Sequence, residues 1–240
     1  MNTMLKFGLS AVAAVALSSL LSNSTAQGRL IFDGTYAVSG TDPTGAAYNG
    51  TMTVVPFGDG YRLTQFYSGV TYRGVGNDIG DYLAGAYLYD NGVPSVSLYR
   101  VTAANTLSGY WQDFDSSKEG TETATLASRA FAFVPSNPVN NTWNYTGSYA
   151  IRGTNPDSSA YSGSMILTSY GDGYRASFAS GGSSWRGIAN YIGNNLAIAW
   201  NNGGVPQVTI YTGNPRSGDL TGFWMDYNTL KEGTEAATLR

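Results

Sequence analysis

Histidine and cysteine are absent from this 240-residue chain. Their absence excludes Ser-His-Asp and Cys-His catalysis, zinc and haem sites that use these ligands, and disulfide bonds. Charged residues are scarce as well, at 12%, and the formal net charge of −3 does not favour a polyanionic partner such as nucleic acid. We therefore expect no nucleic-acid partner and no cofactor.

The chain also lacks a strong metal-binding motif. The two GDG sequences, at 58–60 and 171–173, each supply a single Asp. A calcium ion takes six to eight oxygen ligands, so these sequences are more typical of hairpin turns. We expect no metal site.

No apolar run after residue 26 is long enough to span a membrane. The run at 7–21 follows a short N-terminal segment, residues 1–6, with one positive charge, and small residues at 24–26 fit a cleavage site. This pattern predicts a signal peptide over residues 1–26. The mature protein is then secreted or periplasmic after cleavage near Ala26. A buried N-terminal helix is the alternative interpretation.

What the chain has is an internal repeat. GTYAVSGTDP at Gly34 is matched by GSYAIRGTNP at Gly147, an offset of 113 residues, and FGDGYR, LSGYWQDF and KEGTETATL recur in the same order as YGDGYR, LTGFWMDY and KEGTEAATL. The offset slips by one residue around Gly92 and Gly203 and is then recovered. A conserved order over this length indicates tandem duplication.

The repeat predicts two domains joined by a linker. The expected boundaries are 27–127 for the first repeat, 128–146 for the linker and 147–240 for the second repeat. The linker contains the Pro- and Asn-rich sequence SNPVNN, which is typical of a connecting segment.

Within each copy, short β-rich runs alternate with Gly-, Asn- and Asp-containing turns. Eight strands joined by tight turns match the number that closes into a small barrel without free edges. The predicted fold is all-β, with two tandem eight-stranded antiparallel up-and-down barrels. The strands expected in the first copy are 34–41, 48–55, 60–67, 70–77, 82–89, 94–101, 106–113 and 120–127.

The repeated unit resembles that of a family of exported bacterial proteins. Its members carry G-x-Y-x-V-x-G-x-N-P near the start, a Y-x-G strand, a late L-x-G-x-W and a closing G-T-E, and some are labelled fibronectin-binding. The resemblance covers both copies, implies export and a β fold, and names no catalytic residue.

The architecture is similar to avidin-like and lipocalin-like barrels, which also carry a G-x-W element. Here that element ends at Trp111 and Trp224, late in each copy, whereas lipocalins place it on the first strand. No biotin-binding motif can therefore be transferred to this chain.

Two glutamates follow the KEG sequences at corresponding positions, Glu122 and Glu235. Glu119 and Glu122 are three residues apart, so in an extended strand they point to opposite faces and do not form a two-carboxylate site. Glu122 shares a face with apolar residues and needs a buried partner. We expect that partner to be an arginine, and the alternative is a polar anchor for a ligand. The candidate arginines are Arg62, Arg73, Arg175 and Arg186.

Aromatic residues recur in both copies, and either core packing or a ligand cavity explains them. A cavity would differ between the copies, because Gln65, Tyr67, Tyr72 and Tyr87 are replaced in the second copy by Phe178, Ser180, Trp185 and Trp200. No catalytic residue is assigned. The candidate ligand-binding residues are Trp111, Trp224, Tyr36, Tyr149, Tyr61, Tyr174, Glu122, Glu235, Arg73 and Arg186.

Three functions remain open. The first is a non-catalytic binding protein whose barrels hold a small apolar or amphipathic ligand. The second is a surface or extracellular-matrix protein whose outer strands contact another protein or a glycan, since Tyr is a common interface residue. The third is an enzyme that uses Asp, Glu and Tyr without histidine.

Overall fold

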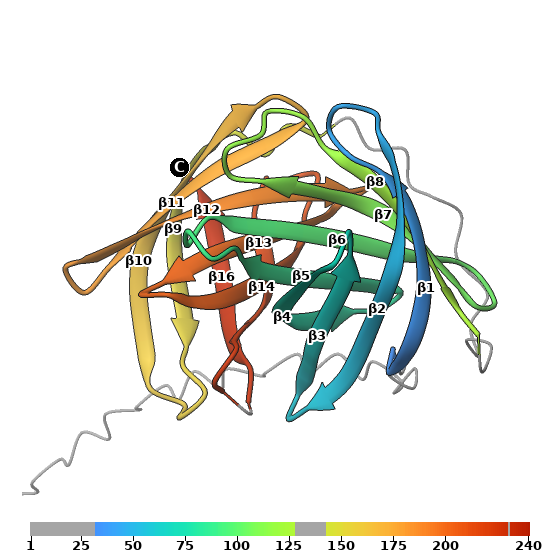
Figure 1. Ribbon diagram of the computed structural model, residues 1–240. Coiled ribbons are helices and arrows are strands. Elements are labelled where there is room, and N and C mark those ends of the chain that lie inside the picture. The colour runs from blue at the N-terminus through green and yellow to red at the C-terminus, as the bar shows by residue number, and fades with distance from the viewer. Residues whose placement is uncertain (1–31, 128–142, 230) are drawn as a thin grey trace, which may run out of the picture.

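The structure, a computed structural model, describes residues 32–127, 143–229 and 231–240. These residues form two closed eight-stranded antiparallel barrels (Figure 1), which confirms the predicted all-β fold. The predicted signal peptide and residues 128–142 of the predicted linker lie outside the described residues. No helix in the described ranges is long and apolar enough to cross a membrane.

Each barrel is a simple meander that closes by pairing its first strand with its last. The first barrel consists of β1 (Gly34–Thr41), β2 (Ala47–Phe57), β3 (Gly60–Tyr67), β4 (Val70–Ile79), β5 (Tyr82–Leu88), β6 (Pro94–Ala103), β7 (Thr106–Asp113) and β8 (Gly120–Leu126). The second consists of β9 (Gly147–Thr154), β10 (Ala160–Tyr170), β11 (Gly173–Ser180), β12 (Ser183–Ile192), β13 (Asn195–Asn202), β14 (Val205–Gly213), β15 (Leu220–Asp226) and β16 (Gly233–Leu239).

One end of each barrel is closed by an aromatic side chain that precedes the first strand. Phe32 is fully buried, and its carbonyl accepts a hydrogen bond of 2.6 Å from the Tyr36 hydroxyl. In the second barrel the buried Tyr145 takes the same place, and its carbonyl accepts a hydrogen bond of 2.8 Å from Tyr149. We call this end of each barrel the floor and the opposite end the mouth.

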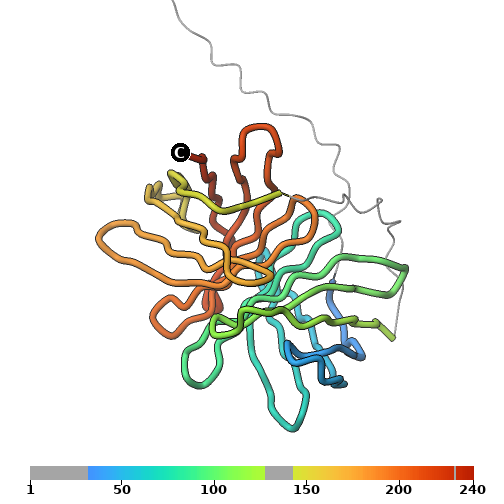
Figure 2. The backbone as a smooth tube through the Cα atoms, turned by 90° about the horizontal axis from the view of Figure 1, so that it is seen from above, coloured from blue at the N-terminus to red at the C-terminus, as the bar shows by residue number. Residues whose placement is uncertain are grey.

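The two barrels pack against each other through β4, β5 and β6 of the first and β12, β13 and β14 of the second (Figures 1 and 2). All but the last residue of β5 are buried. By contrast, β3 alternates between buried and more exposed positions over most of its length. One face of β5 fills its own barrel and the other contacts the second barrel. Alanines at 84, 86, 197 and 199 lie in this contact, where small side chains allow the sheets to approach closely.

The KEG turn of the first barrel reaches the GDG turn of the second. The Glu119 N–H donates to Asp172 Oδ2 over 3.2 Å, and the Glu119 carboxylate accepts a hydrogen bond of 3.0 Å from Asn190. The fit is tight at Gly171, where a Cβ atom would lie 1.4 Å from the Ser117 carbonyl oxygen. Gly171 also has a φ of 62°, which favours glycine.

The reverse contact has the same chemistry. The Glu232 N–H donates to Asp59 Oδ2 over 3.2 Å, and its carboxylate accepts a hydrogen bond of 3.3 Å from Asn77. Each KEG turn therefore docks on the GDG turn of the other copy. This reciprocal contact gives a structural reason for both motifs to occur twice.

Arginine side chains stabilise the same interface through aromatic rings. The Arg62 guanidinium lies 3.9 Å from the ring centroid of Phe57 in its own barrel and 4.7 Å from that of Tyr227 in the other. A guanidinium over an aromatic face is attracted by the ring quadrupole. Arg62 therefore connects the two barrels.

Arg175 makes the corresponding contacts from the second barrel. Its guanidinium lies 3.8 Å from the Tyr170 centroid and 4.6 Å from that of Phe114, whose carbonyl accepts a hydrogen bond of 3.1 Å from Arg175. Arg73 and Arg186 are exposed on the outside of their strands. The described structure thus places all four candidate arginines outside the barrel interiors.

Candidate functional site

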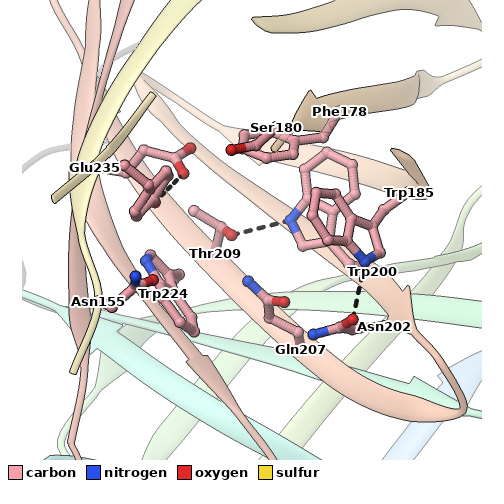
Figure 3. Close-up of a pocket in the computed structure, with 11 residues that line it drawn as sticks. Asn155, Phe178, Ser180, Trp185, Trp200, Asn202, Gln207, Thr209, Trp224 and Glu235 are labelled. Carbon is pink, nitrogen blue, oxygen red and sulfur yellow. Dashed lines mark hydrogen bonds between the residues drawn. The ribbon is translucent and has the colours of Figure 1, made fainter. Parts of the chain in front are cut away.

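The second barrel contains a cavity of about 250 Å³ at its mouth. Its size is slightly below the usual range for drug-sized ligands and suits a smaller molecule. Figure 3 shows the side chains around it. The lining residues are Asn155, Tyr161, Phe178, Ser180, Trp185, Trp200, Asn202, Gln207, Thr209, Trp224 and Glu235.

The up-and-down topology explains why these residues meet. Ser180 and Asn202 end β11 and β13, and Trp185 and Gln207 lie near the starts of β12 and β14. In a meander, the ends of odd strands and the starts of even strands lie at the same end of the barrel. Alternate residues of each strand face inward, so this end collects the lining side chains.

Glu235 is the one carboxyl group among the lining residues, and it is buried. The hydroxyls of Tyr161 and Tyr211 donate hydrogen bonds to its two oxygens. Burial raises the pKa of Glu235 above its ordinary value, and the two tyrosine hydrogen bonds oppose that rise. The site therefore contains a carboxyl group held by hydroxyls.

The corresponding carboxyl group in the first barrel has the same type of partners. Glu122 accepts hydrogen bonds of 2.6 Å from Tyr48 and 2.6 Å from Tyr99, and one of 3.2 Å from the Gln65 amide. Burial raises its pKa also. The expected Glu–Arg pair is wrong for both copies. A neutral hydroxyl satisfies a buried carboxyl without bringing a second charge into the barrel.

Aromatic rings line the side of the cavity opposite Glu235 (Figure 3). The Phe178 centroid lies 5.3 Å from that of Trp185 and 5.9 Å from that of Trp200. Trp185 Nε1 donates to Asn202 over 2.9 Å, and Trp200 Nε1 donates to Thr209 over 2.9 Å. These hydrogen bonds fix both indoles.

Trp224 lies beside the carboxyl group, with its indole against Gly233. A Cβ atom at Gly233 would lie 2.3 Å from Trp224 Nε1. In the first barrel a Cβ atom at Gly120 would lie 2.4 Å from Trp111 Nε1. The Gly of each KEG sequence therefore makes room for the tryptophan of the preceding strand.

The first barrel is closed at the same place. Its interior space is about 10 Å³, close to the lower limit for a single water. Tyr67 stacks on Tyr72 with centroids 4.7 Å apart and lies 5.3 Å from Tyr48. The corresponding residues of the second barrel are Ser180, Trp185 and Tyr161, so a large ring in the first barrel is replaced by a hydroxymethyl group.

The predicted ligand-binding residues separate into three groups. Trp224 and Glu235 line the cavity, and Trp111 and Glu122 line the small space in the first barrel. Arg73 and Arg186 are exposed outside. The four candidate tyrosines, Tyr36, Tyr149, Tyr61 and Tyr174, lie toward the floors. Tyr61 contacts Phe32 edge-on, and the Tyr174 hydroxyl accepts a hydrogen bond from the Tyr145 N–H.

Several polar lining residues were not singled out from the sequence. They are Asn155, Asn202, Gln207 and Thr209. The differences between the two copies in the sequence indicated the location of the cavity. All four second-copy residues at these differences line it, namely Phe178, Ser180, Trp185 and Trp200. Within the described ranges, no group of three or more Asp or Glu side chains is arranged to hold a metal ion.

Comparison with known proteins gives no family assignment. No family model matches the chain, and no curated protein matches it. The resemblance to exported repeat proteins therefore stays a prediction.

Some solved structures align with most of this chain at identities of 14% or less. One is a protein of unknown function from the DUF3598 family of Nostoc punctiforme, at 14% identity and a TM-score of 0.28, covering 87% of this chain and 96% of that one. Another is the Myxococcus xanthus hemagglutinin, solved in complex with a mannopentaose. Its identity is 9% and its TM-score 0.22, and the match covers 86% of this chain and 100% of that one. A third is the Burkholderia oklahomensis agglutinin, with 10% identity and a TM-score of 0.23, and the match covers 86% of this chain and 95% of that one. These TM-scores carry no functional argument.

Proposed function

We propose that this chain is an exported, non-catalytic binding protein whose second barrel holds a small amphipathic ligand. The observation that carries the proposal is the cavity of about 250 Å³ at the mouth of the second barrel. Its five aromatic rings, with polar groups that converge on the same space, are typical of a small-molecule site. The first barrel, with its filled interior, serves as the partner that packs against the binding barrel.

The chemistry of the lining residues favours binding over catalysis. General acid–base catalysis uses groups that exchange protons with the substrate, and hydrolysis of the glycosidase type uses two carboxyl groups. The cavity offers Glu235 alone, and both of its oxygens already accept hydrogen bonds from tyrosines. A single buried carboxyl group is better suited to orienting a ligand.

Native mass spectrometry of the mature protein purified from its own host tests this function. We expect a reproducible bound mass, and we expect Ser180→Tyr to remove it, because Tyr at this position fills the first barrel. Ser177→Tyr is the matched control, since Ser177 lies on the same strand with its side chain exposed outside. A bound mass that survives Ser180→Tyr, or a clean apo mass for the wild type, contradicts the proposal.

A further inference from the structure

The charge of the cavity is one-sided. Glu235 is the one carboxyl group in its lining, and Lys and Arg are absent from that lining. Arg152 pairs with Ala236, the residue that follows Glu235, but it lies on the outer face of the barrel and is exposed. The carboxyl group therefore enters the cavity with hydroxyl partners and without a countercharge among the lining residues.

The two barrels differ in how they satisfy their carboxyl groups. Glu122 receives a third hydrogen bond, from the Gln65 amide. In the second barrel Phe178 replaces Gln65, so an amide donor is exchanged for an aromatic ring. A carboxylate accepts about four hydrogen bonds, and Tyr161 and Tyr211 supply two. Glu235 thus keeps acceptor capacity on the side that faces the cavity.

Five aromatic residues surround the same space: Tyr161, Phe178, Trp185, Trp200 and Trp224. Figure 3 shows Trp224 near Glu235, with Trp185 and Trp200 across the cavity. The indole N–H groups of Trp185 and Trp200 are directed at Asn202 and Thr209. Both indoles line the cavity, and the face of an aromatic ring carries negative potential.

We propose that the ligand of the second barrel is a small organic cation, either a protonated amine or a quaternary ammonium compound. Its positive charge lies among the aromatic faces and compensates Glu235. The inference rests on the proposed function and names its ligand class. A neutral ligand would favour the protonated form of Glu235, whereas a cation pairs with the ionised form and supplies the countercharge that the lining lacks.

This arrangement sets the sign of the pH dependence. A cation favours ionised Glu235, so affinity rises with pH through the pKa of this group and weakens on acidification. The titratable groups that face Glu235 are Tyr161 from β10 and Tyr211 from β14. Burial, with Glu235 nearby, raises the pKa of both tyrosines, so they stay neutral over the acidic and neutral range.

A pair of isosteric probes tests the inference on the full-length protein. Choline and 3,3-dimethylbutan-1-ol have the same shape, and only choline is charged. We expect isothermal titration calorimetry at neutral pH to give at least about tenfold tighter binding of choline. We expect Glu235→Gln to weaken this preference, because the aromatic faces remain and the negative charge is lost. Glu122→Gln, the same change in the closed barrel, should preserve it.

Equal affinity for the two probes, a preference for the neutral one, or failure of both to bind overturns the cation inference. Tighter choline binding at low pH does so as well. The proposed function is judged separately, by the bound mass and its loss in Ser180→Tyr. A neutral ligand in the native mass spectrum would contradict the cation inference and would still support the proposed binding function.

Discussion

Tyr67 stacks on Tyr72 inside the first barrel, with ring centroids 4.7 Å apart and an angle of 21° between the ring planes. Ser180 and Trp185 occupy the same positions in the second barrel, where the cavity lies. The change from Tyr67 to Ser180 is the one substitution among the four noted in this lining that removes a large ring from the interior.

Replacing Tyr67 by Ser should open the first barrel. Loss of the ring leaves space beside Trp111, so Trp111 becomes more accessible to acrylamide quenching. Stability falls by less than the about 3–5 kcal/mol typical of a fully buried aromatic, because Tyr67 is half-buried. Phe66→Ser, on the exposed face of the same strand, is the control and should leave the quenching unchanged. Identical quenching of wild type and Tyr67→Ser would contradict this account.

The raised pKa of Glu122 predicts a particular stability profile. The folded state holds this proton more tightly than the unfolded chain, whose Glu pKa is near 4.5. The stabilisation is therefore fully present below that value and is lost as the pH rises through the raised pKa. Urea unfolding from about pH 3.5 to about pH 7.5 should show wild type losing stability relative to Glu122→Gln.

Asp42 provides a control of opposite sign. Hydrogen bonds from the Thr44 side chain and the Ala46 N–H lower its pKa. Its contribution is present above the ordinary Asp pKa and is lost as the pH falls, so wild type should lose stability relative to Asp42→Asn on acidification. A stability difference between wild type and Glu122→Gln that does not vary with pH would refute the burial argument.

The arginine assignments give a third prediction. Arg62→Ala and Arg175→Ala should each destabilise the contact between barrels by about 0.5–1 kcal/mol, the range for a partly exposed cation–π contact. Arg73→Ala and Arg186→Ala should have little effect, because these side chains are exposed on the outside. Thermal unfolding measures all four. Equal destabilisation in the two pairs would rule out the interface role.

Strand positions were predictable because alternation and turn residues act locally. The predicted 34–41, 60–67 and 106–113 coincide with β1, β3 and β7, and the other strands of the first copy differ by up to two residues at an end. Contacts between copies have no such local signal. The sequence makes Arg62 a candidate partner of Glu122 and places Glu119 in a turn, and neither pattern indicates the contact that each makes with the other barrel.

The site was predictable in part for a related reason. Period-two alternation says that Tyr36 and Glu122 face inward, but it does not say at which height in the barrel. Register decides the height, since Tyr36 pairs with Leu126 near the floor and Glu122 pairs with Gly40 at the other end of β1. Differences between copies were more informative, because they mark the place where the interiors diverge.

The last prediction separates the structural role of the KEG glycines from ligand binding. Gly120→Ala and Gly233→Ala each place a Cβ atom within 2.4 Å of a tryptophan Nε1 and within 2.7 Å of a backbone carbonyl oxygen. Both variants should therefore lower the melting temperature by similar amounts. Trp224 lines the open cavity, whereas Trp111 lies in the closed barrel. Native mass spectra should lose the bound ligand in Gly233→Ala and retain it in Gly120→Ala. Loss in both variants would show that ligand binding follows overall stability, and retention in both would show that Trp224 does not shape the site.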